Sequence, residues 1–283
     1  MTRLMQTVVL GVVMMGLAGP AWAQSRPLVT EDPETVGSGQ ILLEAGIDYS
    51  REAFFPVSGL KGNLWRLGTL GLSFGVSSIA EIQIDGGLRN RLAITNRLAG
   101  PLSGMLDITG DSTADVEDVV VGAKVRVVSE GTGRPSLAVR FATRLPNTGN
   151  ESGLGVDTTD FAFALAMGKT IQQVRVVANG GFAILGDPTR GDRQNDVFIY
   201  GLSIARAIAN GAEVVAELNG RANTRTGTAI VGTESRAAMR IGSRFTRGPV
   251  RLDAAVMFGI TERDPTWGVT TGLTWVFNAF TVK

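Results

Sequence analysis

Two residue types are missing from this sequence of 283 residues: cysteine and histidine. Without cysteine there can be no disulfide framework and no thiolate chemistry. Without histidine there is no imidazole base for a Ser-His or Cys-His hydrolase, and most catalytic zinc sites lose their usual ligands. We therefore expect a protein that is not an enzyme, with no catalytic residues, no metal and no cofactor.

An excess of charge of one sign is also missing. The 27 Lys and Arg residues and the 26 Asp and Glu residues give a formal net charge of +1. Proteins that bind nucleic acid usually present a basic stripe, so nucleic acid is not an expected partner. Hydrophobic residues make up 44% of the chain, which suffices for a core or for a surface that faces lipid.

The first 23 residues are typical of a secretory signal peptide. Arg3 is followed by the apolar stretch 8–17, and Ala21 and Ala23 form an A-x-A cleavage pattern. An uncleaved anchor is the alternative, but glycine and proline shorten the apolar run below the ~20 residues of a spanning helix. The rest of the chain has no apolar run long enough for a membrane helix. The exported protein would be periplasmic, secreted, or a barrel in the outer membrane.

From residue 40 onward, apolar residues alternate with polar or small ones, and this period of two is the signal of β-strands. The pattern predicts twelve strands. Their ranges are 40–52, 64–75, 80–87, 115–128, 135–145, 159–169, 174–185, 196–207, 212–222, 234–246, 250–260 and 267–277. The range 80–87 has the weakest alternation.

Long and short connections alternate along this series of strands. The long connections include 53–63, 88–114, 146–158, 186–195 and 223–233, whereas the short ones include 76–79, 170–173, 208–211 and 247–249. Outer-membrane barrels have this plan, with short turns in the periplasm and long loops outside, and a soluble β-sandwich has no reason for it. We expect an all-β fold, a single antiparallel up-and-down transmembrane β-barrel over residues 41–283, in the bacterial outer membrane.

The second face of the predicted strands carries charge, and we assign it to the lumen. The candidates for lumen or constriction residues are Glu44, Asp48, Glu81, Asp85, Lys124, Arg126, Arg140, Arg144, Glu213, Glu217, Arg240 and Arg244. Hairpin pairing would bring Arg240 and Arg244 within reach of Glu217 and Glu213. Two explanations stay open: ion pairs that brace the interior, or a polarised constriction that filters solutes.

Some residues depart from this alternation. Arg66 and Arg206 fall on the lipid side, so each suggests a snorkelling side chain or a bulge, near Gly68 or Ile208. Two segments could also block the lumen: the periplasmic segment 24–40, as a short plug, or the longest loop, 88–114. An ordinary mobile tail and an external loop are the alternatives.

Several stretches together resemble a known family. They are residues 26–33, the strand 41–49, the stretch 118–124, Leu145-Pro146 before a loop rich in Gly and Asn, and an aromatic last strand. The sequence resembles the bacterial family described as "putative MetA-pathway of phenol degradation". This resemblance implies a transporter-like outer-membrane barrel and passage of aromatic or other hydrophobic compounds.

These observations favour a channel or transporter-like barrel for small, hydrophobic or aromatic solutes. A closed structural or surface-interaction barrel, acting through loops 53–63, 88–114 and 146–158, is the alternative. The expected partners are outer-membrane lipid, a small-molecule solute, and the barrel-assembly machinery during insertion.

Overall fold

The structure is a computed structural model that describes residues 25–282. The predicted signal peptide, residues 1–23, lies outside the described residues. Within the described residues, strands make up nearly all of the regular structure, and the exception is one turn of 3-10 helix, η2 (Ser103–Met105). Within residues 25–282, no helix is long and apolar enough to cross a membrane.

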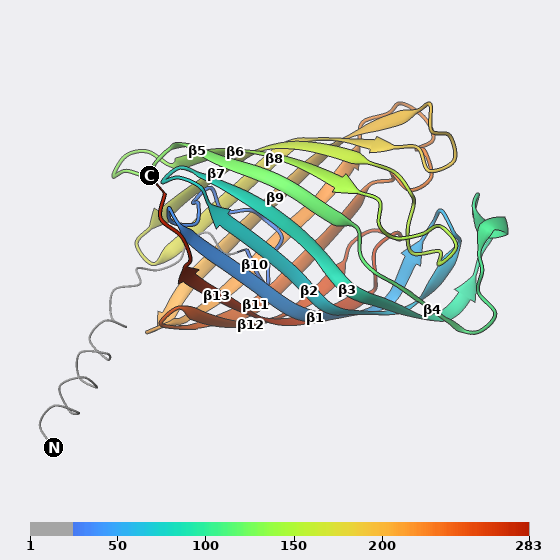
Figure 1. The fold of residues 1–283 in the computed structure, drawn as a ribbon, viewed down its shortest axis with the longest axis horizontal. Helices are drawn as coiled ribbons and strands as arrows, with labels where there is room; N and C mark the ends of the chain where they lie inside the picture. The colour runs from blue at the N-terminus through green and yellow to red at the C-terminus, as the bar shows by residue number, and fades with distance from the viewer. Residues whose placement is uncertain (1–24, 283) are drawn as a thin grey trace, which may run out of the picture.

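The strands form one closed antiparallel barrel (Figure 1). They are β1 (Gln40–Phe55), β2 (Leu60–Gly75), β3 (Ala80–Arg97), β4 (Ser112–Asp115), β5 (Val119–Val128), β6 (Ser136–Leu145), β7 (Asp160–Ile171), β8 (Val174–Gly186), β9 (Gln194–Ala209), β10 (Ala212–Asn223), β11 (Arg236–Arg247), β12 (Val250–Gly259) and β13 (Trp267–Asn278). The ring closes where β1 pairs with β13, with Gln40 opposite Asn278. β4 pairs with the far end of β3, outside the ring of twelve.

The predicted twelve-stranded barrel is confirmed, but two connections were predicted too long. The loop predicted at 53–63 is the turn 56–59, because β1 and β2 both extend past their predicted ends. The loop predicted at 88–114 contains the second half of β3 and all of β4. In this half of β3 the outward side chains include Arg89 and Arg91, so apolar alternation stops although the backbone still pairs with β2.

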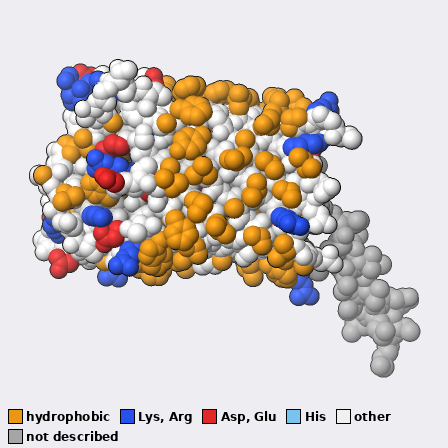
Figure 2. All heavy atoms as spheres, turned by 180° about the vertical axis from the view of Figure 1, so that it is seen from behind, with side chains coloured by type: hydrophobic (Ala, Val, Ile, Leu, Met, Phe, Trp, Pro, Cys, Tyr) orange, Lys and Arg blue, Asp and Glu red, His pale blue; other side chains and the backbone are white. Residues whose placement is uncertain are grey.

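The apolar face of the strands points outward, as a membrane barrel requires. Phe141 and Leu202 expose 56% and 51% of their surfaces, whereas the side chain of Lys124 on the opposite face is fully buried. Figure 2 shows this apolar belt around the middle of the barrel, with charged side chains gathered toward its two ends. A soluble barrel would have the opposite arrangement, since its apolar side chains fill the interior.

A bulge in β2 explains why Arg66 fell on the lipid side in the sequence pattern. Gly46 of β1 pairs with Thr69 and Ile47 pairs with Leu67, so Gly68 has no partner on β1. The backbone of Gly68 is left-handed, with φ of 69°. The extra residue shifts the alternation by one and turns Arg66 into the lumen, where it meets Asp48 at 3.1 Å. Arg206 remains exposed near the short turn 210–211, which fits a snorkelling side chain. β9 also has the expected bulge at Ile208, because Ala207 pairs with Glu213 and Ala209 with Ala212, but this bulge follows Arg206 and leaves it on the lipid side.

The long loops pack together over one end of the barrel, which we call the long-loop end. The tip of the β1–β2 hairpin is buried there, and Val57 and Ser58 each expose only 3% of their surfaces. The Ser58 hydroxyl donates to the carbonyl of Gly153 in the β6–β7 loop, at 2.7 Å. From the β10–β11 side, the Arg236 guanidinium donates to the carbonyl of Phe54, at 3.2 Å. The opposite end carries the short turns and is called the short-turn end (Figure 1).

Candidate functional site in the barrel lumen

Residues 25–39, here called the N-terminal segment, run inside the barrel before β1 begins (blue in Figure 1). Carboxylates on the wall accept hydrogen bonds from the backbone of this segment. Glu217 of β10 accepts from the amides of Val29 and Thr30, at 2.8 and 2.6 Å. Glu81 of β3 accepts from the amide of Val36, at 2.5 Å. Such amides would be costly to bury unpaired, so the wall carboxylates make the seated segment stable.

The acidic side chains of the segment meet cations on the barrel wall. Glu31 lies 3.3 Å from Lys124, and Lys124 also contacts Glu81 at 3.0 Å. Asp32 receives two hydrogen bonds from the Arg175 guanidinium, at 2.7 and 3.0 Å. Paired contacts of this kind fix both the position and the orientation of a carboxylate.

Two further contacts extend this row of ion pairs. Glu34 pairs with Arg126, and Glu31 also lies 3.4 Å from Arg140. Glu31 belongs to the segment and to no membrane-spanning strand. Burial acts to raise the pKa of Glu31, but the charges of Lys124 and Arg140 outweigh burial and hold the pKa below its usual value. Glu31 therefore stays ionised at neutral pH and keeps its pairing with the wall.

Arg26 occupies a niche that the barrel wall leaves free. Gly46 and Gly272 pair across β1 and β13. A Cβ atom on Gly46 would come within 2.2 Å of the Arg26 guanidinium, and one on Gly272 within 2.4 Å. The guanidinium donates to the hydroxyls of Thr69 and Thr270, at 3.1 and 2.8 Å. These two glycines therefore provide the room in which the cation is held.

The predicted contacts between β10 and β11 are present only in part. The pairing brings Glu217 opposite Arg240 and Glu213 opposite Arg244. Glu217 and Arg240 form an ion pair of 2.8 Å. Glu213 and Arg244 are opposite each other, as predicted, but they form no ion pair, because the Arg244 guanidinium donates to the carbonyls of Ser25 and Arg26, at 2.7 and 2.8 Å. The N-terminal segment takes this cation, and Glu213 instead lies 4.0 Å from Arg251 of β12.

The remaining predicted candidates also lie in the lumen. Glu44 accepts from the amide of Arg26, at 3.3 Å. Asp85 is 3.7 Å from Arg140. Arg144, near the long-loop end, pairs with Asp118 and, at 2.5 Å, with Asp160. Among residues 25–282, no group of three or more acidic side chains is placed to hold a metal ion.

Sequence reasoning missed the partners that belong to the segment itself. Arg26, Glu31 and Asp32 are central to the lumen contacts, but they lie before the first strand and take part in no alternation. The signal was present as Arg26 just before Pro27 and the two acids just before Pro33, ahead of the charged strands. Opposite charge alone does not tell which cation each acid will meet.

The lumen contains two neighbouring cavities on the long-loop side of the segment. One, of about 290 Å³, is lined by segment residues and by the walls of β1, β2, β11, β12 and β13. The other, of about 270 Å³, has a polar lining that includes Glu44, Asp85 and Glu117. Arg26 and Arg66 border both cavities. The seated segment thus leaves an open space above it rather than a filled interior.

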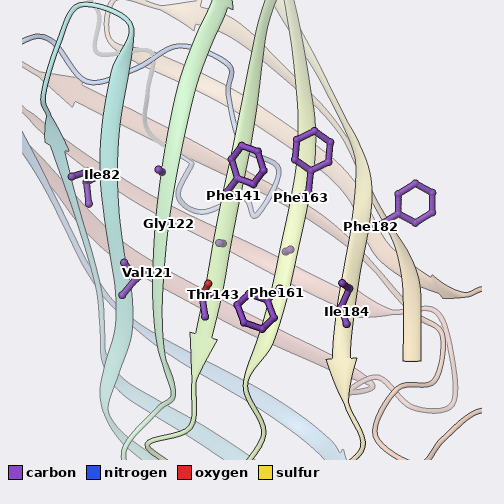
Figure 3. A pocket seen from close by; sticks show the side chains of 12 residues that line it. Ile82, Val121, Gly122, Phe141, Thr143, Phe161, Phe163, Phe182 and Ile184 are labelled. Carbon is purple, nitrogen blue, oxygen red and sulfur yellow. The ribbon is translucent and has the colours of Figure 1, made fainter. Parts of the chain in front are cut away.

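A third hollow lies on the membrane-facing side of the barrel (Figure 3). It measures about 640 Å³, and its phenyl rings come from Phe141, Phe161, Phe163 and Phe182. Phe141 and Phe163 are in ring contact, with centroids 5.0 Å apart. Gly122 of β5 lies between Ile82 and Phe141 (Figure 3). The hollow belongs to the apolar belt and is separate from the charged contacts of the lumen.

The comparisons with known proteins agree with this architecture. The solved structure of the COG4313 outer membrane channel from Pseudomonas putida F1 aligns with a TM-score of 0.62 and 13% identity, covering 87% of this chain and 98% of that one. The NanC porin aligns with a TM-score of 0.52 and 8% identity, covering 83% and 98%. At these identities the likeness shows the fold alone. No curated protein matches the sequence significantly.

The model of one protein family matches nearly the whole chain after the predicted signal peptide. The match covers residues 24–277, and thus includes the N-terminal segment and the barrel almost to its last strand residue. The resemblance seen in the sequence is confirmed: the chain belongs to the family described as "Putative MetA-pathway of phenol degradation".

Proposed function

We propose that this protein is an outer-membrane channel for small solutes, and that its N-terminal segment acts as a plug that closes the lumen. The observation that carries the proposal is the seating of the segment. Its amides bind Glu217 and Glu81, and its acids bind Lys124 and Arg175. Lumen charges that hold a removable segment would become a polar pathway once the segment leaves.

The short-turn end is assigned to the periplasm and the long-loop end to the outside, following the usual plan of outer-membrane barrels. The segment then enters from the periplasmic side, next to the start of β1. Export by the predicted signal peptide and insertion by the barrel-assembly machinery belong to the same proposal. Small hydrophobic or aromatic solutes are proposed as cargo, in line with the family description and with the structural likeness to an outer membrane channel.

The test is single-channel conductance of refolded protein in a planar bilayer. Three forms are compared: the mature chain, a chain that lacks residues 25–36, and a chain of full length in which residues 25–36 are replaced by a Gly-Ser linker. A plug predicts small or rare current steps for the first form and large, stable steps for the other two. Equal conductance in all three folded forms, checked by heat-modifiable gel mobility, would refute a plug.

A closed barrel that acts through its outer loops is the second candidate. The packing of Val57 and Ser58 beneath neighbouring loops supports it, because the long-loop end is covered as well. This alternative predicts no conductance even after the segment is removed. The same experiment therefore separates the two functions.

A further inference from the structure

We propose that the cavity above the N-terminal segment is a binding site for a small organic anion, consisting of an apolar body and one carboxylate. The inference rests on the proposed function, because it names the class of solute that the lumen would hold. The cavity measures about 290 Å³. A cavity of about 150 Å³ is large enough to take up benzene, so this one has room for a ring with a charged substituent.

One side of the cavity is apolar and reaches solvent. Its lining includes Leu28 and Val29 from the segment, Leu64 of β2, Met257 of β12, and Pro265. Val29 exposes 54% of its surface although its backbone amide is bound to Glu217 inside the barrel. An apolar side chain left uncovered in an otherwise charged lumen gains free energy when an apolar ligand covers it.

The other side of the cavity carries net positive charge. The charged residues that line it are Arg26, Arg66, Arg240 and Asp48. Asp48 already accepts from Arg66 at 3.1 Å and from the Thr270 hydroxyl at 2.5 Å. The single acid is therefore occupied, and three guanidinium groups border the remaining space. Each guanidinium also has an acidic partner outside the lining: Asp253 for Arg26, Glu117 for Arg66 and Glu217 for Arg240. This balance favours an anion over a cation.

Arg240 has donor capacity that its protein partners use poorly. Its Nη1 atom donates to Glu217 and to Asn219, at 2.8 and 2.7 Å. The partner of its Nη2 atom is the thioether sulfur of Met257, at 3.6 Å. A thioether is a weak acceptor, so a ligand carboxylate that replaced it would form a stronger, charge-assisted bond. The same contact marks where the charged and apolar sides of the cavity meet.

The test measures binding to the mature protein in detergent by isothermal titration calorimetry. Three probes separate the features of the ligand: benzoate, benzamide with the same ring but no charge, and acetate with the charge but no ring. We expect benzoate to bind about tenfold more tightly than benzamide, the ratio that one charge-assisted hydrogen bond provides. It should also bind more tightly than acetate, which has no ring to bury against the apolar side. Empty detergent micelles correct for partition of the ring.

Three variants assign the effect to the cavity. Arg240→Gln should remove the preference for benzoate over benzamide. Val29→Trp should weaken both aromatic probes equally, because it fills the apolar side. Arg206→Gln, on the outer surface, is the matched control and should bind like the unmodified protein. Heat-modifiable mobility verifies that each variant is folded.

Equal binding of benzoate and benzamide, or a full preference for benzoate in Arg240→Gln, would overturn the proposed site. If the mature protein does not bind benzoate but the chain without residues 25–36 conducts, the site would also be overturned while the channel function would stand. Benzoate binding in a barrel that never conducts would support the site and refute the channel.

Discussion

Lys124 is a cation with no access to solvent, and it is held by three groups from two parts of the chain. Its ammonium group contacts Glu81 of the barrel wall at 3.0 Å and Glu31 of the segment at 3.3 Å. It also donates to the backbone carbonyl of Asp32, at 2.9 Å. Burying a charge costs several kcal/mol unless its partners are well placed. Lys124 therefore couples the seated segment to the folded wall.

Replacing this cation tests that coupling. Lys124→Met leaves Glu81 and Glu31 without their shared partner, and should lower the free energy of unfolding by about 3–5 kcal/mol. Lys61→Met is the control, because the half-exposed pair of Lys61 with Glu52 should contribute less than about 1 kcal/mol. Urea titration of the refolded barrels measures both values. Similar losses in the two variants would show that Lys124 is not an essential partner.

At the residue scale, the sequence allowed some contacts to be predicted and not others. The ion pair of Glu217 with Arg240 follows from parity and hairpin register, which are local properties. The contact of Glu31 with Lys124 joins positions far apart in the sequence. No period connects the two, so only the folded barrel shows that they meet.

At the scale of single strands, the hydrophobic pattern located the part of each strand that faces lipid. β3 illustrates the limit: residues 80–87 alternate, but the strand continues to Arg97 through hydrogen bonds with β2. Beyond the apolar belt the outward side chains need not be apolar, so the pattern ends before the strand does. β1 and β2 are also longer than predicted, and they end at Phe55 and begin at Leu60. In β1 a register shift between Ser50 and Ala53 interrupts the alternation before the strand ends.

The bulge at Gly68 gives a prediction for β2. A side chain there would have to adopt a left-handed backbone and would come within 3.0 Å of Leu88. We expect Gly68→Ala to lower the free energy of unfolding by about 1–2 kcal/mol. Gly104→Ala is the control, because a Cβ atom on Gly104 meets no atom within 4 Å. Urea titration should show no difference between the two variants if the bulge is not needed.

The β6–β7 loop is held by a carboxylate outside the spanning strands. Asp118 accepts from the amides of Asn147 and Thr148, each at 2.9 Å. Burial acts to raise the pKa of Asp118, but these bonds and the charge of Arg144 outweigh burial, and the pKa lies below its usual value. A carboxylate with a lowered pKa stabilises the fold above its unfolded pKa and loses this contribution as the pH falls through the folded pKa.

Hydrogen exchange provides the measurement of this loop. The protection factors of the Asn147 and Thr148 amides should be several-fold lower at about pH 2.5 than at about pH 6, since Asp is protonated only in acid. The Gly153 amide, which donates to the carbonyl of Asn150, is the internal control and should change little. Protection that is equally lost at all three amides would indicate general unfolding in acid and would contradict the role of Asp118.

At the scale of the whole molecule, the barrel separates an apolar exterior from a charged lumen, and successive side chains of each strand face the two in turn. The outside carries an apolar belt, of which Figure 2 shows one face, and the inside carries charges that bind the N-terminal segment. Alternation and loop lengths were enough to predict the barrel and its charged lumen. They could not determine how the segment is seated, because its position depends on the contacts that it makes with several strands around the ring.

The claim that the lumen opens when the N-terminal segment moves is tested most directly by fixing the segment in place and releasing it again. The chain has no cysteine, so an introduced pair would be unique. A Cβ atom on Gly201 would lie 3.3 Å from the Cβ of Thr30, close to the separation of about 3.5–4.5 Å in disulfides. The variant Thr30→Cys/Gly201→Cys should therefore join the segment to β9 on oxidation.

Single-channel currents of this variant are recorded before and after addition of a reductant. We expect a closed barrel while the disulfide is intact and, once it is reduced, the small or rare current steps expected of the mature chain. The single variants Thr30→Cys and Gly201→Cys should not respond to the reductant. Identical current steps in the oxidised and reduced double variant would contradict the claim that movement of the N-terminal segment opens the lumen.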